Sequence, residues 1–245
     1  MRACCSVAMS ARCRIPVAVV ALFALLAAAQ AGACRLPPFA LTYALERGGI
    51  TVGEVVIRFR YEGEGRYSYR SDTRTTGLAA LFAGQRIEQR SEGMWTAAGP
   101  RPVRHEQERE RGGEVARHRL DLGPMPRYQG DAGQWLLAVP DAVYDPPGLL
   151  LALIRAERCG GLQGSYPMVT ETGLLRRFRV ERGVPVALEA LGETWQTIPL
   201  AREEVNGPFR MTLYLAPEFE HLPLRIDWSD GEREYRLRLQ DAEQG

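Results

Sequence analysis

The stretch GEVVIRFRYEGEGRYSYRSDTRTT, residues 53–76, decides the fold class of this chain. Between residues 55 and 61 every second side chain is apolar or aromatic, and arginine stands at two of the three positions between them. A period of two predicts a strand with one buried and one solvated face. The two glycines within residues 62–65 predict a turn, and residues 66–76 predict a second strand that returns beside the first. The stretch therefore predicts an antiparallel hairpin.

The same alternation recurs near the end of the chain. Residues 211–215 and 235–239 place apolar side chains at every second position, and Ser229-Asp230-Gly231 predicts the turn before the last strand. Glycine and proline pairs interrupt the chain at intervals of roughly 8–12 residues, which is typical of all-β domains. No internal repeat or linker divides the sequence. We therefore expect one mainly β domain, residues 34–245: a curved antiparallel sheet or half-barrel with one helix packed against it.

That helix is predicted by local signals. Asp145 is a suitable N-cap, Pro146-Pro147 fix the backbone of the first turn, and Gly160-Gly161 predict the end. The apolar stripe of the helix consists of Leu149, Leu150, Leu153 and Ile154. Burying four aliphatic side chains contributes roughly 6–12 kcal/mol before the cost of ordering is subtracted, so we expect the helix to dock on the sheet. A shorter apolar segment, residues 77–82, predicts a helical turn that closes one end of the sheet.

The first 33 residues have the pattern of a secretory signal peptide. Arg2, Arg12 and Arg14 form a positive region without acids, and an apolar run of 15 residues follows. Ala31-Gly32-Ala33 fits the small-residue pattern of a cleavage site. The run is too short to favour a spanning helix, although an uncleaved N-terminal anchor is the alternative. We expect an exported protein, in the periplasm or anchored to the membrane of the bacterial envelope.

Two cysteines remain after residues 1–33 are removed, Cys34 and Cys159. In an oxidising compartment two thiols favour a disulfide. Cys34 also follows Ala31-Gly32-Ala33 directly, which resembles the lipidation motif of bacterial lipoproteins, with Ala31 in place of the usual larger aliphatic residue. Lipidation of Cys34, a disulfide and a free thiol all stay open at this point. Attachment to the membrane is expected only through the signal segment or such a lipid anchor.

The charge balance gives no indication of nucleic-acid binding. All 31 basic residues are arginine, which the codon use of a GC-rich genome explains. Removing residues 1–33 leaves 28 arginines against 30 acidic residues. A nearly neutral chain lacks the basic excess on which non-specific nucleic-acid binding depends.

Sequence motifs for catalysis are missing. The chain has no phosphate-binding loop, no nucleophile elbow and no dinucleotide fingerprint. Of its three histidines, His105 and His118 fall in a charged hairpin predicted for residues 101–121, where we expect them to be solvated rather than to bind a metal. We therefore expect no cofactor, no metal and no enzymatic activity.

Several short motifs carry a family resemblance. They include Tyr43-Ala44-Leu45 before Ile50–Glu54, then Thr76-Gly77-Leu78 and Ser91-Glu92-Gly93, then Tyr144-Asp145 before the helix, and last Leu222–Ile226. Together they resemble the domain-of-unknown-function family 3108, DUF3108, a family of exported bacterial proteins. The likeness runs from about residue 41 to residue 239 and is loosest over residues 101–134. It implies a fold and an exported protein, and it assigns no catalytic residue.

Two functional hypotheses follow. The first is a non-enzymatic binding or carrier protein for an apolar ligand or lipid, with two apolar patches flanking one opening. The ligand-lining residues would be Leu78, Leu81, Phe82, Leu149, Leu150, Leu153 and Ile154; the alternative role of these side chains is to complete the core. The second hypothesis is a structural or assembly factor that binds an envelope protein through the charged hairpin of residues 101–121.

Overall fold

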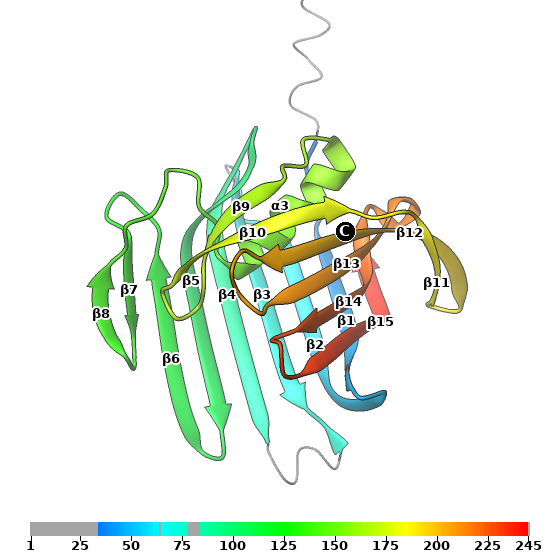
Figure 1. The fold of residues 1–245 in the computed structure, drawn as a ribbon, viewed down its shortest axis with the longest axis horizontal. Coiled ribbons are helices and arrows are strands. Elements are labelled where there is room, and N and C mark those ends of the chain that lie inside the picture. Colours follow the sequence, from blue (N-terminus) through cyan, green and yellow to red (C-terminus); the bar gives the residue numbers. More distant parts are fainter. Residues whose placement is uncertain (1–33, 64, 78–83, 245) are drawn as a thin grey trace, which may run out of the picture. The chain divides into compact units, whose positions relative to one another are not determined.

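The computed structural model of the chain describes residues 34–63, 65–77 and 84–244. The predicted signal peptide and three of the predicted ligand-lining residues, Leu78, Leu81 and Phe82, lie outside these ranges. From Arg35 onward the chain forms one compact unit. Strands dominate this unit, and all of its named strands join one antiparallel sheet with an α-helix packed against it, as the sequence predicted (Figure 1).

The elements follow one another in a simple order. The strands before the helix are β1 (Phe39–Arg47), β2 (Ile50–Tyr61), β3 (Arg66–Thr75), β4 (Gln85–Thr96), β5 (Gly99–Arg111), β6 (Glu114–Asp121), β7 (Arg127–Gly130) and β8 (Gly133–Leu136). The helix α3 (Pro146–Cys159) comes next. It is followed by β9 (Ser165–Val169), β10 (Leu175–Arg182), β11 (Val186–Ala190), β12 (Glu193–Glu204), β13 (Arg210–Ala216), the short 3-10 helix η2 (Pro217–Phe219), β14 (Leu222–Ser229) and β15 (Glu234–Gln244).

The hairpin predicted from residues 53–76 is β2 and β3. Val55, Ile57 and Phe59 are buried on the inner face, and the arginines between them point outward. Phe59 lies opposite Tyr69 in the register of the two strands. The period of two therefore identified both the strands and the face that each buries.

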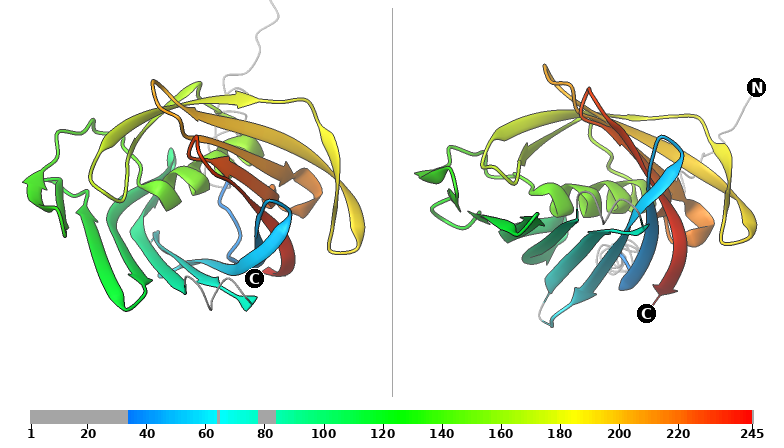
Figure 2. Two further views of the ribbon diagram at one scale, coloured as in Figure 1. Left: turned by 60° about the horizontal axis from the view of Figure 1, so that its bottom comes forward. Right: turned by 90° about the horizontal axis from the view of Figure 1, so that it is seen from below.

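One long-range pairing gives the sheet its order. β1 pairs with β2 on one side and with β15, the last strand, on the other. The order is consequently β8-β7-β6-β5-β4-β3-β2-β1-β15-β14-β13-β12-β10-β9, with β11 paired to β12 beside this path. The sheet is open, because β8 and β9 are its two ends. It curls so that its two halves lie on opposite sides of α3 (Figure 2).

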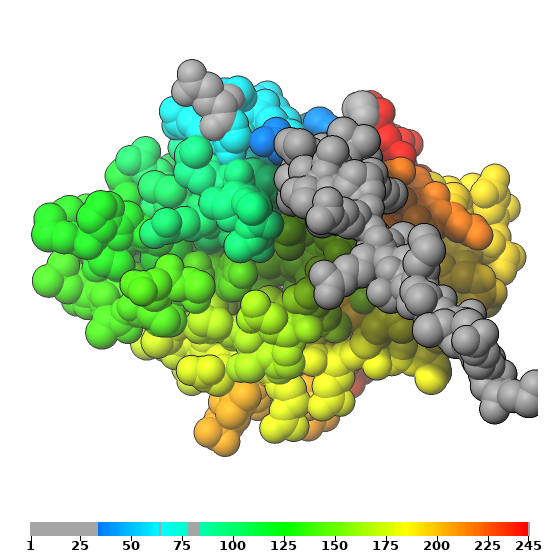
Figure 3. All heavy atoms as spheres, turned by 90° about the horizontal axis from the view of Figure 1, so that it is seen from above, coloured from blue at the N-terminus to red at the C-terminus, as the bar shows by residue number. Residues whose placement is uncertain are grey.

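Helix α3 begins and ends where its caps predicted. Asp145 is the N-cap, prolines occupy the first turn, and Gly160 is the C-cap. The helix is buried on more sides than the predicted stripe: Leu151 is as completely buried as Leu149 and Leu153. Seen from above, the spheres of the helix region lie recessed between the β3–β5 side and the later strands (Figure 3). No helix in the described ranges is both long and apolar enough to cross a membrane.

The core has a main cluster and a small satellite. The main cluster joins the inner faces of β1–β4, α3 and β9–β15. The satellite consists of Leu120, Tyr128 and Val169, with partly buried neighbours that include Trp135. It supports β7 and β8, two short strands that the sequence reading did not identify.

Candidate functional site

A polar row crosses the inner face of β3, β4 and β5, where a sheet interior normally carries apolar side chains. Ser71, Gln89 and Gln107 lie opposite one another in register. The Ser71 hydroxyl donates to Gln89 Oε1 at 3.2 Å, and Gln89 Nε2 donates to Gln107 Oε1 at 2.7 Å. Gln107 is buried, and its Nε2 has no partner among the described residues. The row thus ends in an unused donor.

The neighbouring row brings His105 to the start of the helix. Ser91 of β4 lies directly opposite His105 of β5. His105 Nδ1 is 3.5 Å from Asp145 Oδ2, and both side chains are completely buried. The other carboxylate oxygen of Asp145 accepts a hydrogen bond from the Gly148 amide at 2.7 Å. One carboxylate therefore caps α3 and also approaches the imidazole of β5.

The prediction that His105 and His118 are solvated on an exposed hairpin is wrong. His105 is completely buried, and His118 is partly buried with its Nδ1 2.7 Å from the Tyr128 hydroxyl. The hairpin does alternate, because Gln107 and Leu120 also face inward, while the pairs Glu106–Arg119 and Glu108–Arg117 face outward. Histidine and glutamine at inner positions concealed that alternation in the sequence.

Most of the polar atoms in this inner cluster have no hydrogen-bond partner within the described part of the chain. They include His105 Nδ1 and Nε2, Gln107 Nε2 and Asp145 Oδ2. Buried polar atoms in native proteins are nearly always bonded, to protein or to ordered water. Ordered water is the usual partner of such atoms where the protein supplies none. Burial, together with the Asp145 carboxylate, raises the pKa of Tyr67, so its hydroxyl stays protonated and able to donate.

Ser91, His105 and Asp145 are also the residue types of a hydrolytic triad. Their arrangement differs from such a triad in two respects. Ser91 Oγ makes no hydrogen bond to His105, and all three side chains are completely buried. A substrate carbonyl cannot approach Ser91 Oγ in this conformation. The arrangement can hold a small polar group, but it does not present a nucleophile to solvent.

An apolar row lies on the inner face of the other half of the sheet. Met211, Trp228 and Tyr235 are aligned across β13, β14 and β15, and all three are only partly buried. The Trp228 and Tyr235 rings stack with their centroids 5.1 Å apart. A hollow of about 380 Å³ lies at the same strands, but most of its lining, including Thr212, Asp227 and Arg236, alternates with these three residues and so belongs to the outer face. The row is apolar surface that the protein leaves partly uncovered.

Arg202 of β12 continues this row, because it lies opposite Met211. Only 5% of Arg202 is exposed. Its guanidinium carbon lies over the rings of Phe178 and Phe209, 4.6 and 5.0 Å from their centroids. Burial lowers the pKa of Arg202 to about 10, which still leaves the side chain cationic at neutral pH. The sequence does not single out this residue, because no motif distinguishes it from the many other arginines.

The helical residues predicted to line a ligand site are part of the core. Leu149, Leu153 and Ile154 are completely buried, and Leu150 packs against them. These side chains fill the space between the two halves of the sheet, so they do not face an opening. The concave surface that remains partly exposed is instead formed by strands, and that arrangement depends on long-range pairing.

Cys34 and Cys159 are both disulfide-bonded. A sulfur atom in a disulfide cannot also carry the thioether of a lipid anchor. Of the three alternatives that the sequence left open for these residues, the structure thus favours a disulfide over lipidation or a free thiol.

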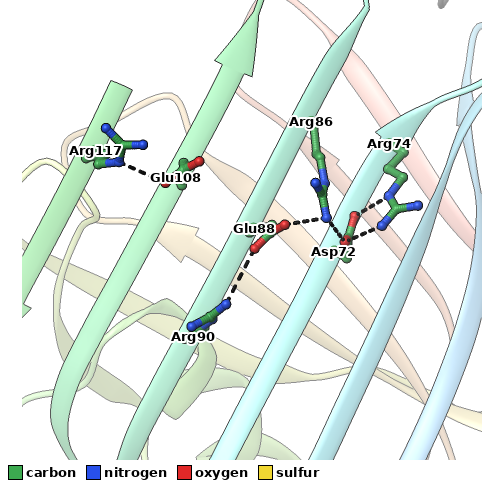
Figure 4. A network of polar contacts seen from close by, with 7 residues as sticks. All are labelled: Asp72, Arg74, Arg86, Glu88, Arg90, Glu108 and Arg117. Atoms are coloured by element: carbon green, nitrogen blue, oxygen red, sulfur yellow. Dashed lines mark hydrogen bonds and ion pairs between the residues drawn. The ribbon is translucent and has the colours of Figure 1, made fainter. Parts of the chain in front are cut away.

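The outer face of β3–β6 is covered by charged side chains that pair within and between strands (Figure 4). Arg74 and Arg86 bind Asp72, Arg86 and Arg90 bind Glu88, and Arg117 binds Glu108 at 2.8 Å. A groove of about 600 Å³ runs across the outer face of β4–β7. Its lining includes Glu88, Arg90, Glu106, Glu108, Arg117 and Arg119. Within the described residues, no three His, Cys, Asp or Glu side chains converge as metal ligands would.

Comparison with known proteins agrees with the fold. The family described as "Protein of unknown function (DUF3108)" matches residues 39–238. A β-barrel-like protein of another unknown-function family, DUF1849, from Brucella abortus has a similar structure, with a TM-score of 0.60 and 14% identity over 86% of this chain and 99% of that one. A DUF1089 family protein from Pseudomonas aeruginosa gives a TM-score of 0.39 and 14% identity, over 68% of this chain and 86% of that one. No curated protein matches the sequence.

Proposed function

The chain belongs to the DUF3108 family, whose function is unknown, so membership assigns no activity. From the features of the concave face, we propose that the protein is a non-enzymatic binding or carrier protein for an amphiphilic small molecule. The observation that carries the proposal is the pairing of two features on one face. Partly uncovered apolar side chains form the row of Met211, Trp228 and Tyr235. Buried polar atoms without partners lie on the same inner face, in Arg202 and in the cluster around His105.

Small-molecule sites combine these two features. They are lined mainly by apolar and aromatic side chains, and a few placed polar groups fix the orientation of the ligand. The proposed setting is the bacterial envelope, where amphiphiles are abundant. The signal-peptide pattern of residues 1–33 supports this setting.

A neutral fluorescent probe, N-phenyl-1-naphthylamine, tests the proposal on the purified full chain. We expect saturable fluorescence enhancement, and Met211→Glu should weaken binding at least about tenfold by placing a charge on the apolar row. Thr212→Glu is the matched control, because its side chain points to the opposite face of β13 and its effect should be small. Absence of saturable binding to the unaltered chain would overturn the proposal. Equal effects of the two substitutions would remove the assignment to the inner face.

The charged outer face favours a second candidate function, the binding of an envelope protein through the hairpin of β5 and β6. The supporting observation is the groove of about 600 Å³ that acidic side chains and arginines line together. Deleting the hairpin is not a clean test, because His105 and Gln107 are part of the interior. Reversing outer charges with Glu108→Arg and Arg117→Glu keeps their mutual ion pair and changes only the pattern that a partner meets. A specific partner in crosslinked envelope extracts should then be lost, and its retention would argue against this function.

A further inference from the structure

Arg202 is buried and has no acidic partner among the described residues. By comparison, the partly buried side chains of Arg158 and Arg225 bind Glu220 and Asp227. Arg202 is more deeply buried than either, yet it forms no ion pair with any described residue, and its Nε has no hydrogen-bond acceptor. A buried cation is normally paired, because burial removes the hydration of the charge. Its counter-charge is therefore absent from the described chain.

The acids nearest in register do not supply that charge. Glu204 follows two residues later on β12, and its carboxylate binds Arg176 at 3.1 Å. Glu203 points toward Arg210 instead, at 3.9 Å. The two phenylalanine rings beside Arg202 attract the cation through their faces, but they offer no oxygen as a hydrogen-bond acceptor. What is missing at Arg202 is an oxyanion.

The position of Arg202 relates this charge to the apolar row. Val180, Arg202 and Met211 lie opposite one another on β10, β12 and β13, and Trp228 continues the row. Met211 is partly exposed, so the row leads from solvent-accessible apolar surface to the buried cation. A guanidinium matches a carboxylate or a phosphate with two parallel hydrogen bonds. An acidic head group at Arg202 would place an attached alkyl chain along Met211 and Trp228.

We propose that Arg202 binds the acidic head group of the ligand, so that the protein selects anionic single-chain amphiphiles over neutral ones. This inference rests on the proposed binding function and adds the class of ligand. It assigns the head group to the inner face of β12, a position that no sequence motif marks. It also gives Arg202 a functional reason to be buried at a cost to stability.

Two probes of equal chain length, dodecanoate and dodecanol, test the inference by calorimetric titration of the full chain. We expect dodecanoate to bind about tenfold or more tightly than dodecanol, because hydrogen bonds to a charged group contribute more than those to a neutral one. Arg202→Met should abolish this preference while leaving dodecanol binding within about twofold. Arg202→Lys keeps the cation, so it should retain a reduced preference for dodecanoate over dodecanol. This variant tests the role of the charge if Arg202→Met does not fold.

Arg179→Met is the matched control, because Arg179 is an exposed residue of the neighbouring strand β10. It should leave the preference unchanged. Acetate is the third probe. If acetate binds as tightly as dodecanoate, the alkyl chain contributes nothing to binding, and the assignment of the ligand as an amphiphile is wrong. If both dodecyl probes bind the unaltered chain equally, or if Arg202→Met leaves their ratio unchanged, the role of Arg202 is refuted and the binding function stands. If neither binds, the binding function fails and this inference fails with it.

Discussion

Asp145 should be the most sensitive single position of the inner face, because its two oxygens serve two elements. Oδ1 accepts the Gly148 amide hydrogen bond that caps α3, and Oδ2 approaches His105 of β5. Replacing Asp145 with alanine removes the cap, which costs about 0.5–2 kcal/mol. It also leaves the buried Gly148 amide without an acceptor, which costs about 1–3 kcal/mol more. Since the two terms overlap, we expect the free energy of unfolding to fall by about 2–4 kcal/mol.

Asp145→Asn separates the cap from the charge. The asparagine side-chain oxygen can accept the same bond, and asparagine is as good an N-cap as aspartate. We therefore expect the asparagine variant to lie within about 1 kcal/mol of the unaltered protein, because only the contact with His105 changes.

Thermal unfolding followed by circular dichroism measures both variants. A change of 1 kcal/mol shifts the melting temperature by about 2–4 °C at this chain length, so Asp145→Ala should lower it by about 5–15 °C. If Asp145→Asn proves as damaging as Asp145→Ala, the negative charge beside His105 stabilises the fold and the capping argument is refuted. If neither variant changes stability, α3 is held by its buried side chains alone.

Three further predictions concern packing, ionisation and surface charge. Gly93→Ala should lower the free energy of unfolding in urea by about 1–3 kcal/mol, because the added methyl would collide with the Arg101 carbonyl and lie 2.8 Å from Tyr67. Gly123→Ala is the control and should be nearly neutral, because nothing lies within 4 Å of the added methyl. Burial, only partly opposed by Arg35, raises the pKa of Tyr61 to about 12 from its ordinary value of 10. The stability that neutral Tyr61 contributes should therefore be complete below pH 10 and lost as the pH rises through about 12. The difference between the alkaline absorbance titrations of the unaltered and Tyr61→Phe chains reports this phenol alone, and a midpoint near its ordinary pKa of 10 would contradict the prediction. Arg117→Met should change stability by less than about 1 kcal/mol despite the 2.8 Å pair with Glu108, because both side chains are largely exposed, and a loss above that would indicate a cooperative network.

The parts of the fold that local signals specify could be predicted from the sequence. Helix α3 has a side-chain cap, two prolines and a C-terminal glycine within one short segment, so its limits follow from local chemistry. The β2–β3 and β14–β15 hairpins combine a period of two with a turn, which is again local. The pairing of β1 with β15 is different in kind. It joins residues at opposite ends of the chain, and nothing in either strand alone identifies its partner.

The functional surface could not be predicted for the same reason. Arg202, Met211 and Trp228 become one row only through the register of three strands. Leu149 and Leu153 look like a binding patch in the sequence, but both halves of the sheet close over them. His105 looks like a surface residue among charges, although its position in β5 faces inward. Side-chain chemistry alone did not identify these environments, because burial is decided by elements that are distant in the sequence.

The concave face has two polar features, the cluster around His105 and the side chain of Arg202. They lack different kinds of partner, and for that reason Arg202 says more about a ligand. Polar atoms of His105 and Gln107 lack hydrogen bonds, and ordered water can supply these without any ligand. Arg202 lacks a counter-charge, which water cannot supply and which the two phenylalanines replace only in part. Replacing it with methionine should therefore raise the stability of the ligand-free protein, because a buried unpaired charge would be removed. A residue that costs stability in the free chain is best explained by a partner that the free chain does not contain.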